Sequence, residues 1–196
     1  MQRLHSVDRQ DASGRTRELL DAVELALGTI PNAARIMANS PAVLESFLGF
    51  SAAMNGAGIG EKLHNQIKLA TSESNACDYC TSILTVVAPT AGLSVDEILA
   101  SRAGKADDQR AKAALAFAND VLESRGKVGS TRIDSLRDAG FDDGEIVEIV
   151  ASVVLGCFTN FLNNVADTEL DIPIATPLPT AGHSPARCGT ETCSAH

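Results

Sequence analysis

The sequence is poor in aromatic residues: it has no tryptophan, one tyrosine and six phenylalanines among 196 residues. The interior must therefore be built from leucine, isoleucine, valine and alanine, a mixture that favours helices. No segment alternates apolar and polar residues in the way that is typical of a strand. We expect an all-α protein, and the chain is long enough for a single domain with a sizeable core.

Basic residues are also scarce, since 16 lysines and arginines stand against 25 acidic residues and give a net charge of −9. An acidic chain without a basic stripe argues against nucleic acid and against an anionic membrane as partners. The longest apolar run, residues 149–158, covers only about half of a membrane span, and residues 1–8 lack the apolar centre of a signal peptide. We therefore expect a soluble, cytoplasmic protein.

Apolar residues recur at helical spacing, and capping residues, prolines and glycines mark where the segments begin and end. The predicted helices cover residues 15–27, two segments that begin at Pro31 and Pro41, and residues 61–74, 77–88, 95–101, 107–124, 131–139 and 143–167. The last of them carries the widest apolar stripe, so we expect it to be the most buried helix.

The composition divides the chain into three parts. Residues 1–13 are polar and are expected to be loose and flexible, and residues 14–172 form the helical domain. Residues 173–196 form an irregular tail, because frequent prolines exclude helix and sheet there.

The chain has five cysteines, and two of them stand three residues apart in the run Asn75-Ala76-Cys77-Asp78-Tyr79-Cys80. If Cys77 lies in the first turn of a helix, unpaired backbone N–H groups and the helix dipole favour a thiolate there. The spacing also puts both sulfurs on one face, close enough to form a disulfide. The pattern favours a redox dithiol, although half of a zinc site and two buried small residues remain alternatives.

Blocks of sequence around this motif resemble a known family. They are Gly28-Thr29-Ile30-Pro31-Asn32, residues 63–85 around the dithiol, residues 158–163 and residues 168–173. The dithiol block resembles the alkylhydroperoxidase AhpD-like / carboxymuconolactone decarboxylase superfamily, and the last two blocks resemble its peroxidase-related branch. The resemblance spans roughly residues 25–173. It implies an AhpD-like helical domain that assembles into homotrimers or hexamers.

The resemblance also implies an antioxidant activity, the reduction of hydroperoxides or protein disulfides without a metal or an organic cofactor. Cys80 would attack the substrate, Cys77 would resolve the intermediate as a disulfide, and an external thiol would restore the pair. The family's Glu and His, which relay protons, are replaced here by Asn65 and Leu84. A missing general base typically costs about 10²–10⁴ in rate, whereas slow thiol–disulfide exchange needs less apparatus.

Other residues offer substitutes for the missing relay. Glu61 stands one helical turn before Asn65 and is our candidate catalytic acid or base; Glu73 and His64 are further candidates. A solvated surface position is the simpler expectation for each of the three. Polar residues that could line a pocket beside the dithiol, or could merely be ordinary helix polarity, are Tyr79, Asn160, Asn163 and Asn164. Cys157 falls on an apolar helical stripe and is expected to be an inert core residue.

The tail contains His183, Cys188, Cys193 and His196. These residues are ligand types for tetrahedral zinc, they could form a second dithiol that exchanges with the first, or they could have no chemical role. Three functions thus compete with the oxidoreductase: a degenerate oligomeric scaffold, metal or metalloid binding through the tail, and lactone decarboxylation without the thiols.

Overall fold

The computed structural model describes residues 1–178, and within that range it contains helices and no strand. The expected all-α fold class is therefore confirmed. The helices are α1 (Gly14–Leu27), α2 (Asn32–Met37), α3 (Pro41–Asn55), α4 (Gly60–Ser74), α5 (Asp78–Val87), the 3-10 turn η1 (Ala88–Ala91), α6 (Val95–Arg102), α7 (Gln109–Ser124), α8 (Ser130–Asp138) and α9 (Asp143–Ala166).

Local chemistry explains why the predicted boundaries agree with these helices to within a few residues. At α6 and α9, Ser94 and Asp142 accept a hydrogen bond from the backbone N–H three residues later. The carboxylate of the glutamate at that position accepts one from the N–H of the capping residue. α1 ends at Gly28, whose φ of 72° lies in the left-handed region that glycine adopts without steric cost. These signals act over a few residues and can be read without knowledge of the tertiary structure.

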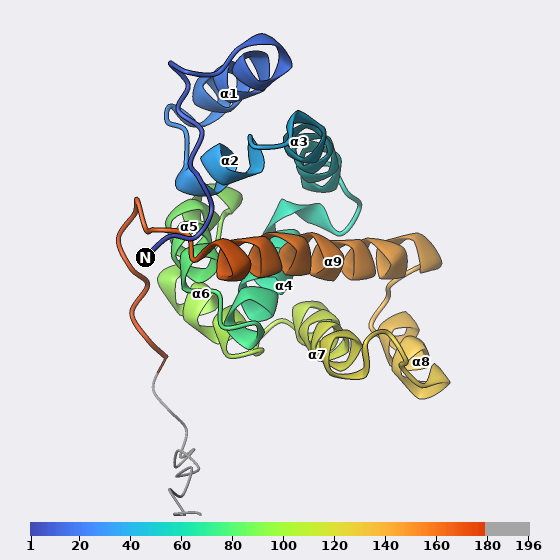
Figure 1. Cartoon of the computed structure of the whole chain (residues 1–196). Helices are drawn as coiled ribbons and strands as arrows, with labels where there is room; N and C mark the ends of the chain where they lie inside the picture. The colour runs from blue at the N-terminus through green and yellow to red at the C-terminus, as the bar shows by residue number, and fades with distance from the viewer. Residues whose placement is uncertain (179–196) are drawn as a thin grey trace, which may run out of the picture.

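Helix α4 lies at the centre of the molecule. It packs against α3, α5, α6, α7 and α9, while α9 runs across it with α1–α3 on one side and α7–α8 on the other (Figure 1). Nine of the 15 residues of α4 are buried, against nine of the 24 residues of α9. The expectation that the last helix would be the most buried is therefore wrong, because one long face of α9 points away from the core.

That outward face of α9 is apolar. Its exposed side chains follow helical spacing along the whole length of the helix: Val147, Val154, Phe158, Phe161 and Val165. By length and composition α9 could cross a membrane, but its other face is part of the protein core and packs on α4.

Helices α4 and α9 approach each other closely at Gly156. A Cβ atom at that position would lie 2.9 Å from Cγ2 of Thr71, a distance that real Cβ atoms do not adopt. Only glycine therefore permits this packing, which brings the polar residues farther along α9 next to α5.

Both ends of the described chain run along the helical body. In the N-terminal segment, Arg3 donates its N–H to the carbonyl of Ala166 at 2.7 Å and Val7 donates to the carbonyl of Arg35 at 3.1 Å. After α9, residues 168–178 form no helix and pass alongside α5 and α6 (Figure 1). We call these residues the C-terminal strap.

Candidate active site

The dithiol lies at the start of α5, where the spacing of the two cysteines predicts it. Cys77 is the N-cap, and its sulfur accepts a hydrogen bond from the N–H of Cys80 at 3.3 Å. Ala76 makes the turn out of α4 with a φ of 48°, an uncommon conformation for a residue other than glycine. Both cysteines are free thiols and are only 1% and 3% exposed.

The sulfur of Cys80 has polar neighbours despite this burial. The side-chain amide of Asn163 donates to it at 3.3 Å and also donates to the carbonyl of Thr159. The amide is held in this orientation because the hydroxyl of Thr168 donates to its oxygen at 2.7 Å. A polar residue of α9 thus stabilises negative charge on Cys80.

A second asparagine closes the polar layer between α4 and α9. Asn160 is fully buried, donates to the hydroxyl of Ser72 at 3.0 Å and accepts from Asn75 at 2.9 Å. Asn75 also donates to the sulfur of Cys157 at 3.5 Å, and this half-buried residue packs against the main core cluster; that its thiol is inert stays a prediction. Of the asparagines for which the sequence leaves a pocket wall and ordinary helix polarity open, Asn160 lies in this buried layer and Asn163 bonds to Cys80, whereas Asn164 is exposed and donates to the carbonyl of Asn75.

These contacts distinguish the two thiols. A hydrogen bond from the thiol of Cys77, helped by the amides of Asn160 and Asn163, lowers the pKa of Cys80 to about 7. The same hydrogen bond to Cys80, together with burial, raises the pKa of Cys77. Cys80 is thus the thiol that ionises first, as a nucleophile must.

Lys68 is a neighbour of Cys80 that we did not single out from the sequence. It lies on α4, four residues after His64, and is partly buried. Burial lowers the pKa of Lys68, and the negative charges of Cys80 and Glu61 act in the opposite direction. The available signal was spacing: Lys68 stands seven residues after Glu61 and so shares a helix face with it.

His64 is fully buried, so the expectation of a surface position is wrong. Its Nδ1 lies 2.8 Å from the hydroxyl of Ser152, and that hydroxyl donates its only proton to the carbonyl of Glu148. Nδ1 therefore carries the hydrogen, and Nε2 has a lone pair without a partner among the described residues. Burial and, secondarily, the charge of Lys68 lower the pKa of His64 to about 4.

The C-terminal strap is tied to the dithiol helix. The hydroxyl of Tyr79 donates to one carboxylate oxygen of Asp171 at 2.8 Å, and the N–H of Asn32 donates to the other at 2.8 Å. Further along, the N–H of Ala175 donates to the hydroxyl of Ser82 at 2.9 Å. The strap thus covers the face of α5 that carries Tyr79 and Ser82.

The sequence matches no protein-family model, and no curated protein is similar enough in sequence to be a relative. Solved structures do match. A peroxidase-related protein of Ralstonia eutropha JMP134 with an alkylhydroperoxidase AhpD core superposes with a TM-score of 0.75 at 23% identity, over 86% of this chain and 91% of that one. A peroxidase-related protein of Silicibacter sp. TM1040 superposes with a TM-score of 0.72 at 18% identity, over 79% and 83%.

The chain has the AhpD-like fold. The debrominase Bmp8 shares it, with a TM-score of 0.71 at 23% identity over 85% of this chain and 90% of that one. A cysteine-to-alanine variant of Bmp8 in complex with 2,3,4-tribromopyrrole superposes with a TM-score of 0.72 at 22% identity, over 86% and 91%. The AhpD-like fold thus occurs in proteins of different activities, so the chemistry must be argued from the site.

At the two positions where the AhpD-like motif has Glu and His, this chain has groups that cannot act as a base. Asn65 donates its amide to the carbonyl of Glu61 at 2.9 Å. Leu84 is buried in an apolar cluster with Leu69 and Ala88. The proton-relaying Glu and His of the AhpD-like motif are therefore both missing at the positions where the motif has them.

Neither of the remaining substitutes, Glu61 and Glu73, hydrogen-bonds to a sulfur of the dithiol among the described residues. The side chain of Glu61 is exposed, and it affects the site through its charge on Lys68. Glu73 pairs with Arg102 at 2.9 Å and is partly buried, not a free surface residue. The predicted catalytic role of Glu61 stays a prediction.

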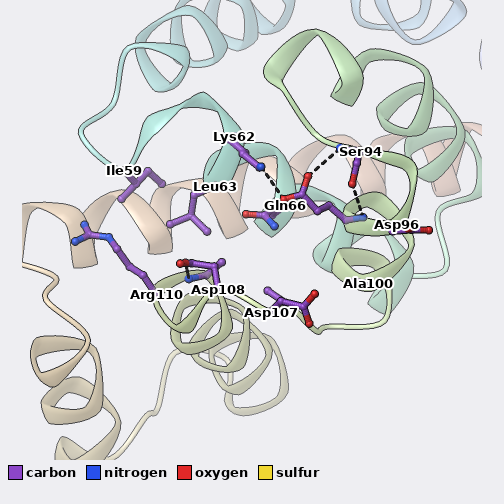
Figure 2. A pocket seen from close by; sticks show the side chains of 13 residues that line it. Ile59, Lys62, Leu63, Gln66, Ser94, Asp96, Ala100, Asp107, Asp108 and Arg110 are labelled. Carbon is purple, nitrogen blue, oxygen red and sulfur yellow. Dashed lines mark hydrogen bonds and ion pairs between the residues drawn. The ribbon is translucent and has the colours of Figure 1, made fainter.

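A pocket of about 640 Å³ lies between α4, α6 and α7, away from the dithiol (Figure 2). It contains no cysteine or histidine, and the lysine at its edge, Lys62, pairs with Glu97 at 2.6 Å. Arg110 is likewise paired, with Glu145. Because both of its basic side chains are already paired and it offers no thiol or imidazole, we place the chemistry at the dithiol and not in this pocket.

Within residues 1–178, no group of three or more His, Cys, Asp or Glu side chains is arranged to hold a metal ion. The tail residues His183, Cys188, Cys193 and His196, considered above for zinc or a second dithiol, lie outside the described residues.

Proposed function

We propose that this protein is a thiol-dependent oxidoreductase that reduces hydroperoxides, or disulfides, through Cys77 and Cys80. The observation that carries the proposal is the asymmetric dithiol: a buried pair in which the amide of Asn163 donates to the sulfur of Cys80 and not to that of Cys77. Two identical inert thiols would not need amide donors directed at one of them. The pair is also at i, i+3 spacing at a helix start, where a disulfide can form.

The peroxide reaction follows from these roles. The Cys80 thiolate attacks the terminal oxygen of the hydroperoxide, the O–O bond breaks, and the alkoxide takes a proton and leaves as an alcohol. Cys80 is then a sulfenic acid, which Cys77 attacks to form the disulfide with loss of water. Two external thiols reduce the disulfide and become a disulfide themselves.

Lys68 supplies the charge that the missing relay would have supplied. Its ammonium group stabilises the Cys80 thiolate and can give a proton to the departing alkoxide. The imidazole of His64 is close enough to Lys68 to be affected by its charge and stays neutral, and its Nε2, which has no partner among the described residues, can accept a hydrogen bond. In this proposal the two residues on α4 replace the Glu and His of the resemblance.

We further propose that the protein is a homo-oligomer of the cytoplasm. The apolar outer face of α9 is the surface that a second copy would cover, as the resemblance to trimeric and hexameric proteins implies. A reducing compartment keeps external thiols available for the last step.

The test is stopped-flow reduction of cumene hydroperoxide with a small dithiol as reductant. We expect Cys80→Ser to abolish turnover and Cys77→Ser to stop it after one equivalent, while Cys157→Ser leaves it unchanged. Wild-type behaviour of Cys80→Ser would overturn the oxidoreductase. 2,3,4-Tribromopyrrole, the ligand of the Bmp8 variant, serves as a comparison substrate.

The main competing function is a helical scaffold that has lost its chemistry. The absence of the Glu and His of the resemblance favours it. A Cys80 pKa near the ordinary value of a free thiol, together with no disulfide after mild peroxide treatment, would support the scaffold.

A further inference from the structure

A pocket of about 260 Å³ lies beside the dithiol, under the C-terminal strap. Its walls come from the end of α4, from α5, from α6 and from the strap itself. Cys77 lines this pocket and Cys80 does not. The two cysteines therefore have different surroundings: Cys80 faces the amide of Asn163 on α9, and Cys77, whose side chain is fully buried, is one of the residues around this pocket.

Two hydrogen bonds hold the strap over the pocket. The N–H of Ala175 donates to Ser82 of α5 at 2.9 Å, and Nη1 of Arg102 donates to the carbonyl of Thr176 at 2.9 Å. The side chain of Arg102 is only 3% exposed and is fixed by its ion pair with Glu73. The roof of the pocket is thus tied to both α5 and α6 by specific contacts.

The lining indicates what can enter. Strap residues Ile174, Pro177 and Leu178 give an apolar wall. The charged lining groups are the carboxylates of Glu73 and Asp78 and the guanidinium of Arg102, which Glu73 already neutralises. The surplus carboxylate disfavours an anion, and the small volume disfavours a bulky molecule.

We propose that the external thiol enters through this pocket and attacks the sulfur of Cys77, so that the disulfide is opened from the strap side. The thiol that fits is narrow, aliphatic and without negative charge. This inference rests on the proposed function, because it assigns the step that restores the dithiol. It gives the strap a role as the wall of a reductant site.

The disulfide is reduced by two successive thiol–disulfide exchanges. The external thiolate bonds to the sulfur of Cys77, the Cys77–Cys80 bond breaks, and its electron pair goes to Cys80 as a thiolate. A second external thiolate then attacks the external sulfur of the mixed disulfide, releasing Cys77, which takes up a proton. The sulfur of Cys80 is the better leaving group, since Asn163 and Lys68 stabilise its negative charge.

Access of a small molecule to Cys77 can be tested in a protein that cannot form the Cys77–Cys80 disulfide. In a Cys80→Ser background, 2-hydroxyethyl disulfide is added and the mixed disulfide at Cys77 is followed by peptide mass mapping. Ala175→Phe fills the pocket and should slow labelling at least tenfold. Thr176→Phe is the matched control, because the Thr176 side chain is exposed and does not line the pocket, and it should stay within twofold. Equal rates for the two variants would overturn the proposal.

The wild-type protein gives a second measurement. After oxidation, 2-mercaptoethanol should reduce the disulfide about tenfold faster than mercaptoacetate, when both are normalised to a model disulfide. No preference between them would overturn the assigned charge of the entering thiol. If peroxide forms no Cys77–Cys80 disulfide at all, the proposed function fails, and the labelling rates still decide whether the pocket leads to Cys77.

Discussion

The side-chain amide of Asn163 donates a hydrogen bond to the sulfur of Cys80 at 3.3 Å, across 83 residues of sequence. The bond joins the last helix to the dithiol helix and connects the reactivity of the sulfur to the tertiary structure. A helix start alone favours thiolates, but it does so for whichever sulfur lies nearest to it. The amide makes the choice between the two sulfurs specific.

Asn163→Ala should raise the pKa of Cys80 by about one unit, because a hydrogen bond to a charged group is worth about 1.5–3 kcal/mol and part of it is replaced by water. With the pKa of Cys80 at about 7 in the wild type, the thiolate fraction at pH 7 falls several-fold. The pH profile of iodoacetamide alkylation, mapped to Cys80, measures this shift. Asn164→Ala is the control, since the neighbouring amide bonds a backbone carbonyl instead.

Lys68→Met should raise the pKa of Cys80 as well, and should slow disulfide formation by peroxide about tenfold, as expected for the loss of a proton donor and a neighbouring charge. Lys62→Met removes a lysine from the same helix and is the matched control, because Lys62 pairs with Glu97. Equal peroxide rates in the two variants would remove Lys68 from the mechanism.

His64 should make stability depend on pH. Its folded-state pKa of about 4 lies below the value of 6.5 for a free histidine, so the unfolded chain binds the proton more readily. The contribution of neutral His64 to the free energy of unfolding is complete above pH 6.5 and is lost as the pH falls towards 4. Between pH 7 and pH 5 we expect a loss of about 2 kcal/mol.

Urea unfolding at the two pH values and at fixed protein concentration measures that loss. His64→Gln removes the titrating group, so its stability should change about 2 kcal/mol less than that of the wild type over the same interval. An identical change in both proteins would mean that other groups cause the pH dependence.

The outer face of α9 should hold the oligomer together. Phe161→Glu places a charge in the apolar stripe, where desolvating it would cost several kcal/mol, and should convert the oligomer into monomers. Light scattering coupled to size exclusion reports the mass. Val95→Glu introduces the same charge at an exposed position on α6 and should leave the mass unchanged. A monomeric wild type would contradict the proposed oligomer directly.

The sequence predicts those parts of the site that depend on local geometry. The position of Cys77 at a helix start follows from residues within one turn, and the partners Asn160 and Asn163 follow from an apolar helix that carries polar residues late in its length. Local spacing places Lys68 on the helix face of Glu61, but its position beside Cys80 and the burial of His64 could not be predicted in this way. Whether a residue on α4 faces solvent or the interior depends on how α5 and α9 cross it, and that crossing is a tertiary property.

The strap shows the same limit. Its irregular backbone follows from its prolines, but its pairing with Tyr79 and Ser82 depends on where the end of α9 points. Similarly, apolar spacing on α9 predicts a helix but does not say which of its apolar residues face inward. Apolar residues are typical both of a protein interior and of a surface that contacts another protein, so the sequence does not distinguish the two.

Gly156 carries a consequence for the evolution of this site. The contact of Gly156 with Thr71 sets the distance between α9 and α4. It lies one to two helical turns before Asn160 and Asn163. A methyl group at this position would push α9 away from α4, and would move Asn163 away from the sulfur of Cys80 and Asn160 away from Ser72. A substitution at Gly156, which has no side chain and takes no part in the reaction, can thus change the pKa and the reactivity of the Cys80 thiol.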